Sequence, residues 1–260
     1  MSVNNSTIVS CINRHYETLL KMGYIDLSDI SVPPNAGWSD EQLHVDALRA
    51  MGRSEKVIDL LRLIPYLREN ETADSVEIYP ETFQLRYLRD GRWFGTATEE
   101  EFSNTSMLDL GFAPFDGPVP ADMISLTHAD EGVWWVIDTN ENVIYPYGTE
   151  FDSEHQAPED QPWRAVEPED VLSYFNRINH QLDNLEVVPA PRSGKWDSRV
   201  VDAQTEEGQL VSRLYREFGW HSGGGFRKEE FRQAVEQQRA PLLDAALGHD
   251  SDDEDEEMAG

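Results

Sequence analysis

The chain has 260 residues, of which 39% are hydrophobic and 10% aromatic, and this is enough for one substantial core or two small ones. It carries 50 acidic against 21 basic residues, a formal net charge of −29. A chain so acidic repels phosphate backbones and anionic lipid surfaces, so we expect neither nucleic acid nor a membrane as a direct partner. No run of the sequence approaches the roughly 18 apolar residues of a membrane span.

The start of the chain lacks the basic region and the long apolar run of a signal peptide. The single cysteine, Cys11, excludes an intramolecular disulfide and is typical of a reducing compartment. We therefore expect a protein of the cytosol or the nucleus.

Helical spacing of apolar residues predicts a first helix over residues 7–22. A second helix is expected to begin at Ser39, because Ser39 and Gln42 fit the capping box, and to end near Met51. Ser54 is a good N-cap for a third helix. That helix has apolar residues around most of its circumference, so we expect it to be buried on more than one side.

From residue 76 the apolar residues alternate as in strands. The clearest signal is a hairpin, with one strand over Gly132–Ile137 and the other over Val143–Tyr147. The turn between them is rich in Asp and Asn, which bond to their own backbone and tolerate unusual dihedral angles. Trp134 and Trp135 are adjacent in the first strand, so their side chains must point to opposite faces of the sheet.

The hairpin aromatics are our candidate partner-binding residues: Trp134, Trp135, Tyr145 and Tyr147. One of the two tryptophans faces away from any single core layer and so needs a helix, a partner or water to cover it. The alternative interpretation is that all four side chains belong to core and cross-strand packing.

The sequence of the C-terminal third predicts mainly helices and few strands. A helix is expected from Pro168, followed by a linker or surface strap over residues 188–204. Two further helices, over Glu206–Phe218 and Phe226–Arg239, form a predicted helical hairpin. From about Gly248 the chain lacks apolar residues and is expected to be disordered.

No motif in the sequence identifies a catalytic, metal or cofactor site. The seven histidines lack the H-E-x-x-H spacing, and His128 with Asp130 and Glu131 is more typical of a solvated turn than of a metal site. Ser251 precedes an acidic run that acidophilic kinases recognise, so we predict that it is phosphorylated. One interleaved group of charges is interpreted as an ordinary helix surface and not as a nucleic-acid site: Arg213, Arg216, Arg227, Lys228 and Arg232, among Glu217, Glu229 and Glu230.

Three segments together resemble the SUKH, or Smi1/Knr4-like, superfamily of fungal cell-wall regulators and bacterial immunity proteins. They are THADEGVWWVIDTNENVIYPYG over residues 127–148, DLLRLIPYL over residues 59–67 and PEDVLSYFNRINHQL over residues 168–182. The resemblance covers roughly residues 40–186, with Glu131-Gly132 where the family has glycine followed by aspartate. It implies an α+β domain that binds other proteins and does not catalyse a reaction.

We therefore expect an α+β fold with N-terminal helices, a central mixed or antiparallel sheet, a closing helix and a C-terminal helical hairpin. The expected parts are a main domain over residues 1–187, the linker or strap, a hairpin over residues 205–247 and an acidic tail over residues 248–260. The expected function is a non-catalytic intracellular scaffold or regulator that binds a protein partner. The alternative is a hydrolase whose site is assembled from scattered His, Asp and Glu residues.

Overall fold

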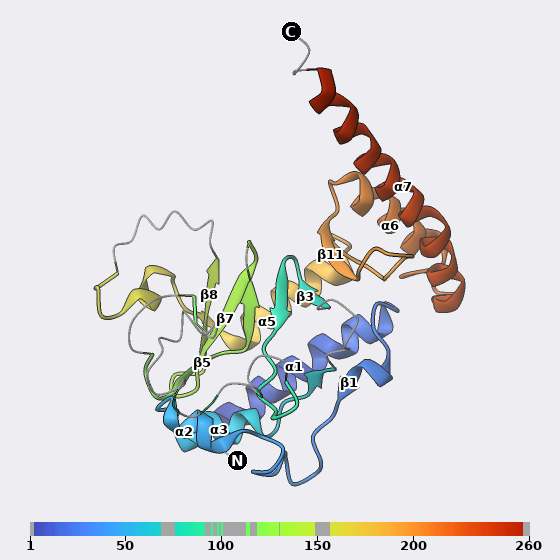
Figure 1. Cartoon of the computed structure of the whole chain (residues 1–260). Coiled ribbons are helices and arrows are strands. Elements are labelled where there is room, and N and C mark those ends of the chain that lie inside the picture. The colour runs from blue at the N-terminus through green and yellow to red at the C-terminus, as the bar shows by residue number, and fades with distance from the viewer. Residues whose placement is uncertain are drawn as a thin grey trace.

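A computed structural model describes residues 3–68, 76–91, 95, 98, 100, 113–114, 119–129, 131–148 and 157–256, with the backbone alone for residues 3, 4 and 248–256. The chain has the expected α+β architecture, in which helices pack on antiparallel sheets. Figure 1 shows the N-terminal helices and the central sheet in one body, with the last two helices at one end of it.

The first helix, α1 (Val3–Lys21), packs along the closing helix α5 (Val171–Asp183). Its buried side chains include Ile8, Ile12 and Leu19, which recur at the three- and four-residue spacing of one helix face. The helix ends just before Gly23, whose φ of +75° suits a residue without a side chain. The sequence therefore predicted this helix within a few residues.

The second helix, α2 (Val45–Ala50), begins six residues later than expected, at a site without the predicted cap. Ser39 and Gln42 do form the hydrogen bond of a capping box, from Ser39 N to Gln42 Oε1 at 3.2 Å. The chain does not continue as a helix there because Leu43 forms an isolated β-bridge with Leu88. Backbone pairing with a distant segment thus overrides the local capping signal.

The third helix, α3 (Glu55–Leu61), begins as predicted, with Ser54 Oγ accepting a hydrogen bond from the N–H of Val57. Its buried residues lie on more than one side, as the sequence predicted: Val57, Ile58, Leu60 and Leu61. In the sequence, α2 and α3 are flanked by the 3-10 helix η1 (Leu27–Asp29) and by the two strands of a small sheet, β1 (Ile30–Ser31) and β2 (Tyr66–Leu67). A second 3-10 helix, η2 (Pro162–Ala165), lies beside β8.

The central sheet lies in two parts, with strand orders β5-β7-β8-β9 and β3-β4-β6. They are connected because β5 and β6 are successive segments of one stretch, interrupted only at Leu126. All of these described pairings are antiparallel. The strands are β3 (Glu77–Tyr79), β4 (Thr82–Gln84), β5 (Met123–Ser125), β6 (Thr127–Ala129), β7 (Val133–Asp138), β8 (Val143–Gly148) and β9 (Glu169–Asp170).

The predicted hairpin is β7 and β8, paired along their whole length. In its turn, Asp138 Oδ1 accepts hydrogen bonds from the N–H groups of Asn140 and Glu141, at 2.7 and 3.1 Å. Asn142 has a φ of +60°, which asparagine tolerates better than most residues. The turn chemistry that the sequence indicated is therefore present.

The closing helix α5 starts later than predicted. Pro168 is not its first residue, because Glu169 and Asp170 pair with β8 as β9, and Asp170 then caps the helix. The buried apolar residues of α5 include Val171, Phe175, Ile178 and Leu182, whereas Leu172 is 47% exposed.

Residues 188–204 do not form a linker. Strands β10 (Val187–Ala190) and β11 (Arg199–Asp202) pair there as an antiparallel hairpin, and β11 packs beside β3 of the body. The two strands lie next to the C-terminal helices α6 (Glu206–Glu217) and α7 (Lys228–Glu256). They therefore connect the helical hairpin to the central sheet.

The last helix is much longer than predicted. We expected it to end at Arg239, but the backbone of α7 is helical to Glu256, with Pro241 inside it. The side chains from residue 248 and all of residues 257–260 lie outside the described part of the chain, so disorder of the acidic tail stays a prediction.

Candidate functional site

The predicted partner-binding face of the hairpin is not an open surface. Trp134 lies opposite Tyr147 and Trp135 opposite Pro146, so the two tryptophans do point to opposite faces as expected. Yet Trp134 is only 8% exposed, Trp135 2% and Tyr145 4%, and Tyr147 is half-buried. Both tryptophans are therefore buried within the chain.

Both faces of the hairpin are covered by other parts of the chain. The ring of Trp135 lies edge-on to His15 of α1 and Phe175 of α5, with centroids 5.4 and 5.0 Å away. On the other face, Trp134 lies 6.4 Å from the ring of His128. The second of the two interpretations, core packing, thus holds for this hairpin.

His15 is the buried titratable group nearest this core, and its contacts are structural. Its Nε2 lies 2.8 Å from the carbonyl oxygen of Ile78, and its Nδ1 lies 2.8 Å from Asn179 Oδ1. Burial lowers the pKa of His15, so the ring is neutral and has one N–H donor. Asn179 Nδ2 has no hydrogen-bond partner among the described residues. When the Asn179 amide is rotated so that its oxygen and nitrogen exchange places, Nδ2 donates to Nδ1 of His15. His15 thus connects α1, α5 and β3.

Among the described residues, no three His, Cys, Asp or Glu side chains gather closely enough to hold a metal ion. No described helix is long and apolar enough to cross a membrane. Cys11 is buried, and burial raises the pKa of its thiol, so the thiolate is disfavoured.

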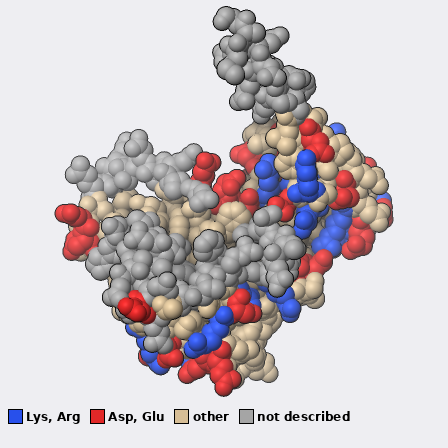
Figure 2. Space-filling model, viewed as in Figure 1, with Lys and Arg blue, Asp and Glu red and all other residues tan. Residues whose placement is uncertain are grey.

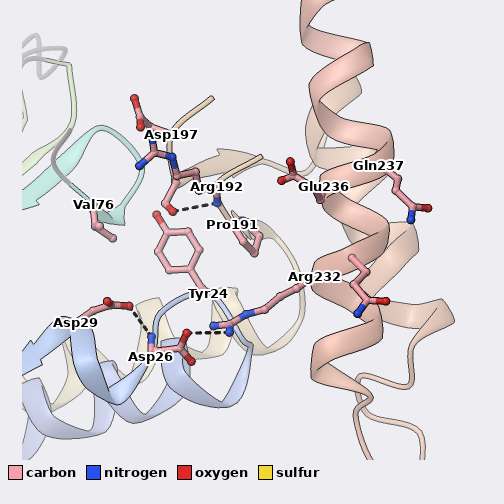
Figure 3. A pocket seen from close by; sticks show the side chains of 12 residues that line it. Tyr24, Asp26, Asp29, Val76, Pro191, Arg192, Asp197, Arg232, Glu236 and Gln237 are labelled. Carbon is pink, nitrogen blue, oxygen red and sulfur yellow. Dashed lines mark hydrogen bonds and ion pairs between the residues drawn. The ribbon is translucent and has the colours of Figure 1, made fainter. Parts of the chain in front are cut away.

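A cleft of about 530 Å³ lies at the junction of the body with α7 (Figure 3). Tyr24 lies in the middle of it, with Val76 on one side and the α7 residues Arg232 and Glu236 on the other. This cleft is the obvious place to look for an assembled active site, because it collects charged side chains from distant parts of the sequence.

The described charges of the cleft hold the junction together. Arg232 donates to Asp26 Oδ2 at 2.8 Å and to the carbonyl oxygen of Gly23 at 2.7 Å. The carboxylate of Glu236 accepts the N–H of Gly194 at 3.1 Å. Hydrogen bonding to Arg232 lowers the pKa of Asp26, which keeps it ionised and makes it a poor general acid. The hydrogen bonds of these charged residues therefore hold α7 against η1 and the β10–β11 turn.

A second group of charges fixes α7 where it leaves the body. Arg239 is fully buried, and its Nε donates to Glu207 Oε1 of α6 at 2.6 Å. The other carboxylate oxygen of Glu207 accepts Arg199 of β11 at 3.0 and 2.5 Å. Arg239 also donates to the carbonyl oxygen of Pro191 at 2.9 Å. This network, Arg199–Glu207–Arg239, in which Glu207 and Arg239 are buried, connects both C-terminal helices to the β10–β11 hairpin.

Beyond this network α7 extends past its packing partners, as Figure 1 shows. The helix has 29 residues against 12 for α6, which is about 44 Å against about 18 Å at ~1.5 Å per residue. Phe231, Val235 and Arg239, at four-residue spacing, are fully buried against the body. Further along the helix, Leu243 is half-buried and Leu247 is 54% exposed. At ~3.6 residues per turn, the step from Phe231 to Leu247 turns the helix by about 160°, so Leu247 does not continue the buried face of α7.

A groove of about 720 Å³ lies between α6 and this distal part of α7. Its apolar lining is Leu210 of α6 with Pro241 and Leu242 of α7. Arg213 spans it with a hydrogen bond to Gln238 at 3.3 Å. Leu247 lies outside this groove, because it is turned by about 140° from Leu242 around the helix. We call the apolar lining of the groove the distal α7 surface: Leu210, Pro241 and Leu242.

The charged helix surface predicted from the sequence lies on α6 and α7. Figure 2 shows acidic and basic side chains side by side on that part of the molecule. Arg227 pairs with Glu230 at 3.0 Å, and Lys228 pairs with Asp26 at 3.4 Å. These pairings neutralise the described basic group locally, in agreement with an ordinary helix surface.

The predicted site residues and the distal α7 surface are therefore different parts of the molecule. The hairpin aromatics lie in the core, and the side chain of Ser251 lies outside the described residues. The distal α7 surface was missed because the predicted last helix ended at Arg239. No local pattern marks this surface, because its lining comes from two different helices.

Comparison of the chain with protein-family models, with curated proteins and with solved structures finds no match. The resemblance to the SUKH superfamily therefore stays a prediction.

Proposed function

We propose that this protein is a non-catalytic scaffold or regulator that binds another protein in the cytosol or nucleus. The observation that carries the proposal is exposed apolar surface on α7: Leu247 is 54% exposed, and Pro241 and Leu242 line a groove with Leu210 of α6. Apolar side chains on a projecting helix are typical of a surface that a partner covers. The SUKH resemblance supports the same class of function.

The hydrolase alternative has less support among the described residues. Glu77 has the most strongly raised carboxyl pKa, about 7, because it is buried. Its carboxylate accepts the N–H of Val200 at 2.7 Å, and Glu77 does not line the junction cleft. Asp26, which does line the cleft, has a lowered pKa. Neither carboxyl group has both the access and the pKa of a general acid or base.

The test is affinity capture from source cells with the full-length chain, followed by mass spectrometry and by reconstitution of each candidate complex from purified proteins. The expected result is at least one protein that binds the purified chain in a fixed stoichiometry. Residues 248–260 fused to the affinity tag are the control for purely electrostatic capture. If all captured proteins also bind this tail fusion, or if the chain instead turns over ester or phosphoester substrates, the proposal is wrong.

A further inference from the structure

We propose that Glu77 makes the contact between β3 and β11 a pH-responsive joint, in which β11 separates from β3 more often as the pH rises to neutrality. This inference does not depend on the proposed function. No motif in the sequence indicated the joint, because its two members, Glu77 and Val200, are 123 positions apart.

The joint connects two sheets that no ladder connects. Strand β11 pairs with β10 alone, and β3 belongs to the sheet β3-β4-β6, so no backbone ladder among the described strands runs between β11 and β3. The two strands nevertheless lie side by side (Figure 1). Val200 lies opposite Pro189 of β10, and its N–H donates to Glu77 Oε2 at 2.7 Å. A titratable side chain therefore takes the place of a neighbouring strand at this edge of β11.

The carboxyl group that forms this link is buried. Glu77 is 7% exposed. Burial raises its pKa from 4.5 to about 7, and the charge of Glu81 acts in the same direction, whereas the N–H of Val200 and the charge of Arg199 act in the opposite one. Burial outweighs these favourable contacts, so the packed joint holds a proton at a pH where an exposed glutamate has none.

The cation that faces Glu77 is already engaged by another carboxylate. Arg199 of β11 donates to Glu207 of α6 at 3.0 and 2.5 Å. Glu207 also accepts Arg239 of α7, so this ion-pair network has its own buried carboxylate to compensate. An ionised Glu77 must therefore share Arg199 with Glu207.

Two titratable side chains that contact β3 from the N-terminal part of the chain are neutral. The hydroxyl of Tyr24 donates to the carbonyl oxygen of Glu77 at 2.9 Å, and His15 Nε2 lies 2.8 Å from the carbonyl oxygen of Ile78. Burial raises the pKa of Tyr24 and lowers that of His15. Neither side chain compensates a negative charge on Glu77.

Separation of β11 from β3 relieves this charge, because it admits water to the carboxylate and restores its ordinary pKa. The four pairs between β10 and β11 and the ion pair between Arg199 and Glu207 do not have to break, so the opening is local. The packed pKa is the higher one, so the preference for the packed state is complete below pH 4.5 and is lost as the pH rises to about 7. From about pH 6 to about pH 8, the equilibrium constant for opening is expected to rise about tenfold.

Hydrogen exchange of single amides, followed by NMR on the full-length chain, locates the opening. The reporter is the N–H of Val200, and the reference is the N–H of Leu126, which donates to Trp135 within the central sheet at 2.9 Å. We expect the opening constant at Val200 to be at least about tenfold larger than at Leu126 and almost constant over ~0–1 M urea, because a local opening exposes little surface. Equal opening constants with equal urea dependence would mean that β11 leaves β3 only when the whole chain unfolds, and the inference would be wrong.

The pH dependence of the Val200 opening constant identifies the group that titrates. We expect the tenfold rise in the wild-type protein and a change within about twofold in Glu77→Gln. The matched control is Glu186→Gln, which removes an exposed carboxyl group next to β10 and is expected to keep the rise. A rise that persists in Glu77→Gln would overturn the inference. If that variant does not fold, the wild-type protein alone decides, because an opening constant that stays level from about pH 6 to about pH 8 would also overturn it.

Discussion

The two adjacent tryptophans of β7 are both core residues, on opposite faces of the same sheet. We predict that Trp134→Ala and Trp135→Ala each lower the free energy of unfolding by about 3–5 kcal/mol, the usual cost of truncating a buried aromatic side chain. Urea unfolding monitored by circular dichroism measures both.

Leu172→Ala is the control, because Leu172 is 47% exposed on α5 and its truncation is expected to cost well under about 1 kcal/mol. A mild effect of Trp134→Ala beside a severe effect of Trp135→Ala would mean that the Trp134 face is open, as the sequence alone suggested.

The carboxyl group of Glu77 in β3, which accepts the N–H of Val200 in β11, makes the stability of the protein depend on pH. Burial raises its pKa from 4.5 to about 7, although the N–H of Val200 and the charge of Arg199 favour the ionised form. The folded state therefore holds a proton that the unfolded state releases between pH 4.5 and about 7. Because the folded pKa is the higher one, the stability contributed by protonated Glu77 is complete below pH 4.5 and is lost as the pH rises to about 7.

Glu77→Gln removes this titration and keeps an oxygen to accept the N–H of Val200. Between about pH 5 and pH 8, we expect the wild-type protein to lose stability relative to the variant by on the order of 2 kcal/mol. Denaturant unfolding at several pH values measures the difference. A difference that does not change with pH would show that Glu77 titrates normally.

At the scale of elements, helix α7 has two halves with different surroundings. Its first half is held by buried apolar residues and by the Arg199–Glu207–Arg239 network, and its second half extends past α6. The first half ends at this network, because Arg239 is the last fully buried residue of the helix among those described.

We predict that Arg239→Met destabilises the protein by about 3–5 kcal/mol, because it leaves the buried carboxylate of Glu207 with Arg199 as its single cationic partner. The matched control is Arg213→Met, which removes an exposed arginine of α6 that donates only to Gln238 and is expected to cost about 0.5 kcal/mol or less. Thermal unfolding compares them, and hydrogen exchange reports whether α6 and α7 lose protection first. Equal effects of the two variants would contradict a role for the network.

At the scale of the whole molecule, the body and the C-terminal helices share one framework of buried contacts, and a run of seven acidic residues over 250–257 lies at the end of a chain that is acidic throughout. Residues 248–257 contain no apolar side chain that folding could bury, and their negative charges repel one another. We predict that deletion of residues 248–260 changes the melting temperature of the partner-free protein by less than about 5 °C at physiological salt. Differential scanning calorimetry measures this change, and a larger drop would show that the tail packs against the body.

Ser251 lies within this acidic run, followed by Asp252, Asp253 and Glu254. We predict that an acidophilic kinase such as casein kinase 2 phosphorylates it, which would add about −1.5 to −2 of charge and strengthen attraction to a basic partner. Labelling of the purified chain is expected to fall sharply in Ser251→Ala. Undiminished labelling of that variant would assign the phosphate to another residue.

The sequence by itself determined the elements whose signals are local. It predicted the α+β class, helix α1, the cap of α3 at Ser54 and the β7–β8 hairpin, because side-chain periodicity and turn chemistry act over a few residues. It also determined the charge of the chain, from which the class of partner is inferred.

The tertiary structure decided everything that depends on distant segments. Leu43 pairs with Leu88 in place of starting a helix, residues 188–204 form a hairpin beside β3, and both faces of the tryptophan strand are covered. The distal α7 surface is of the same kind, because its lining comes from both α6 and α7. A periodic pattern in a sequence states that a helix has an apolar face, and only the packing of the whole chain determines how far along the helix that face is covered.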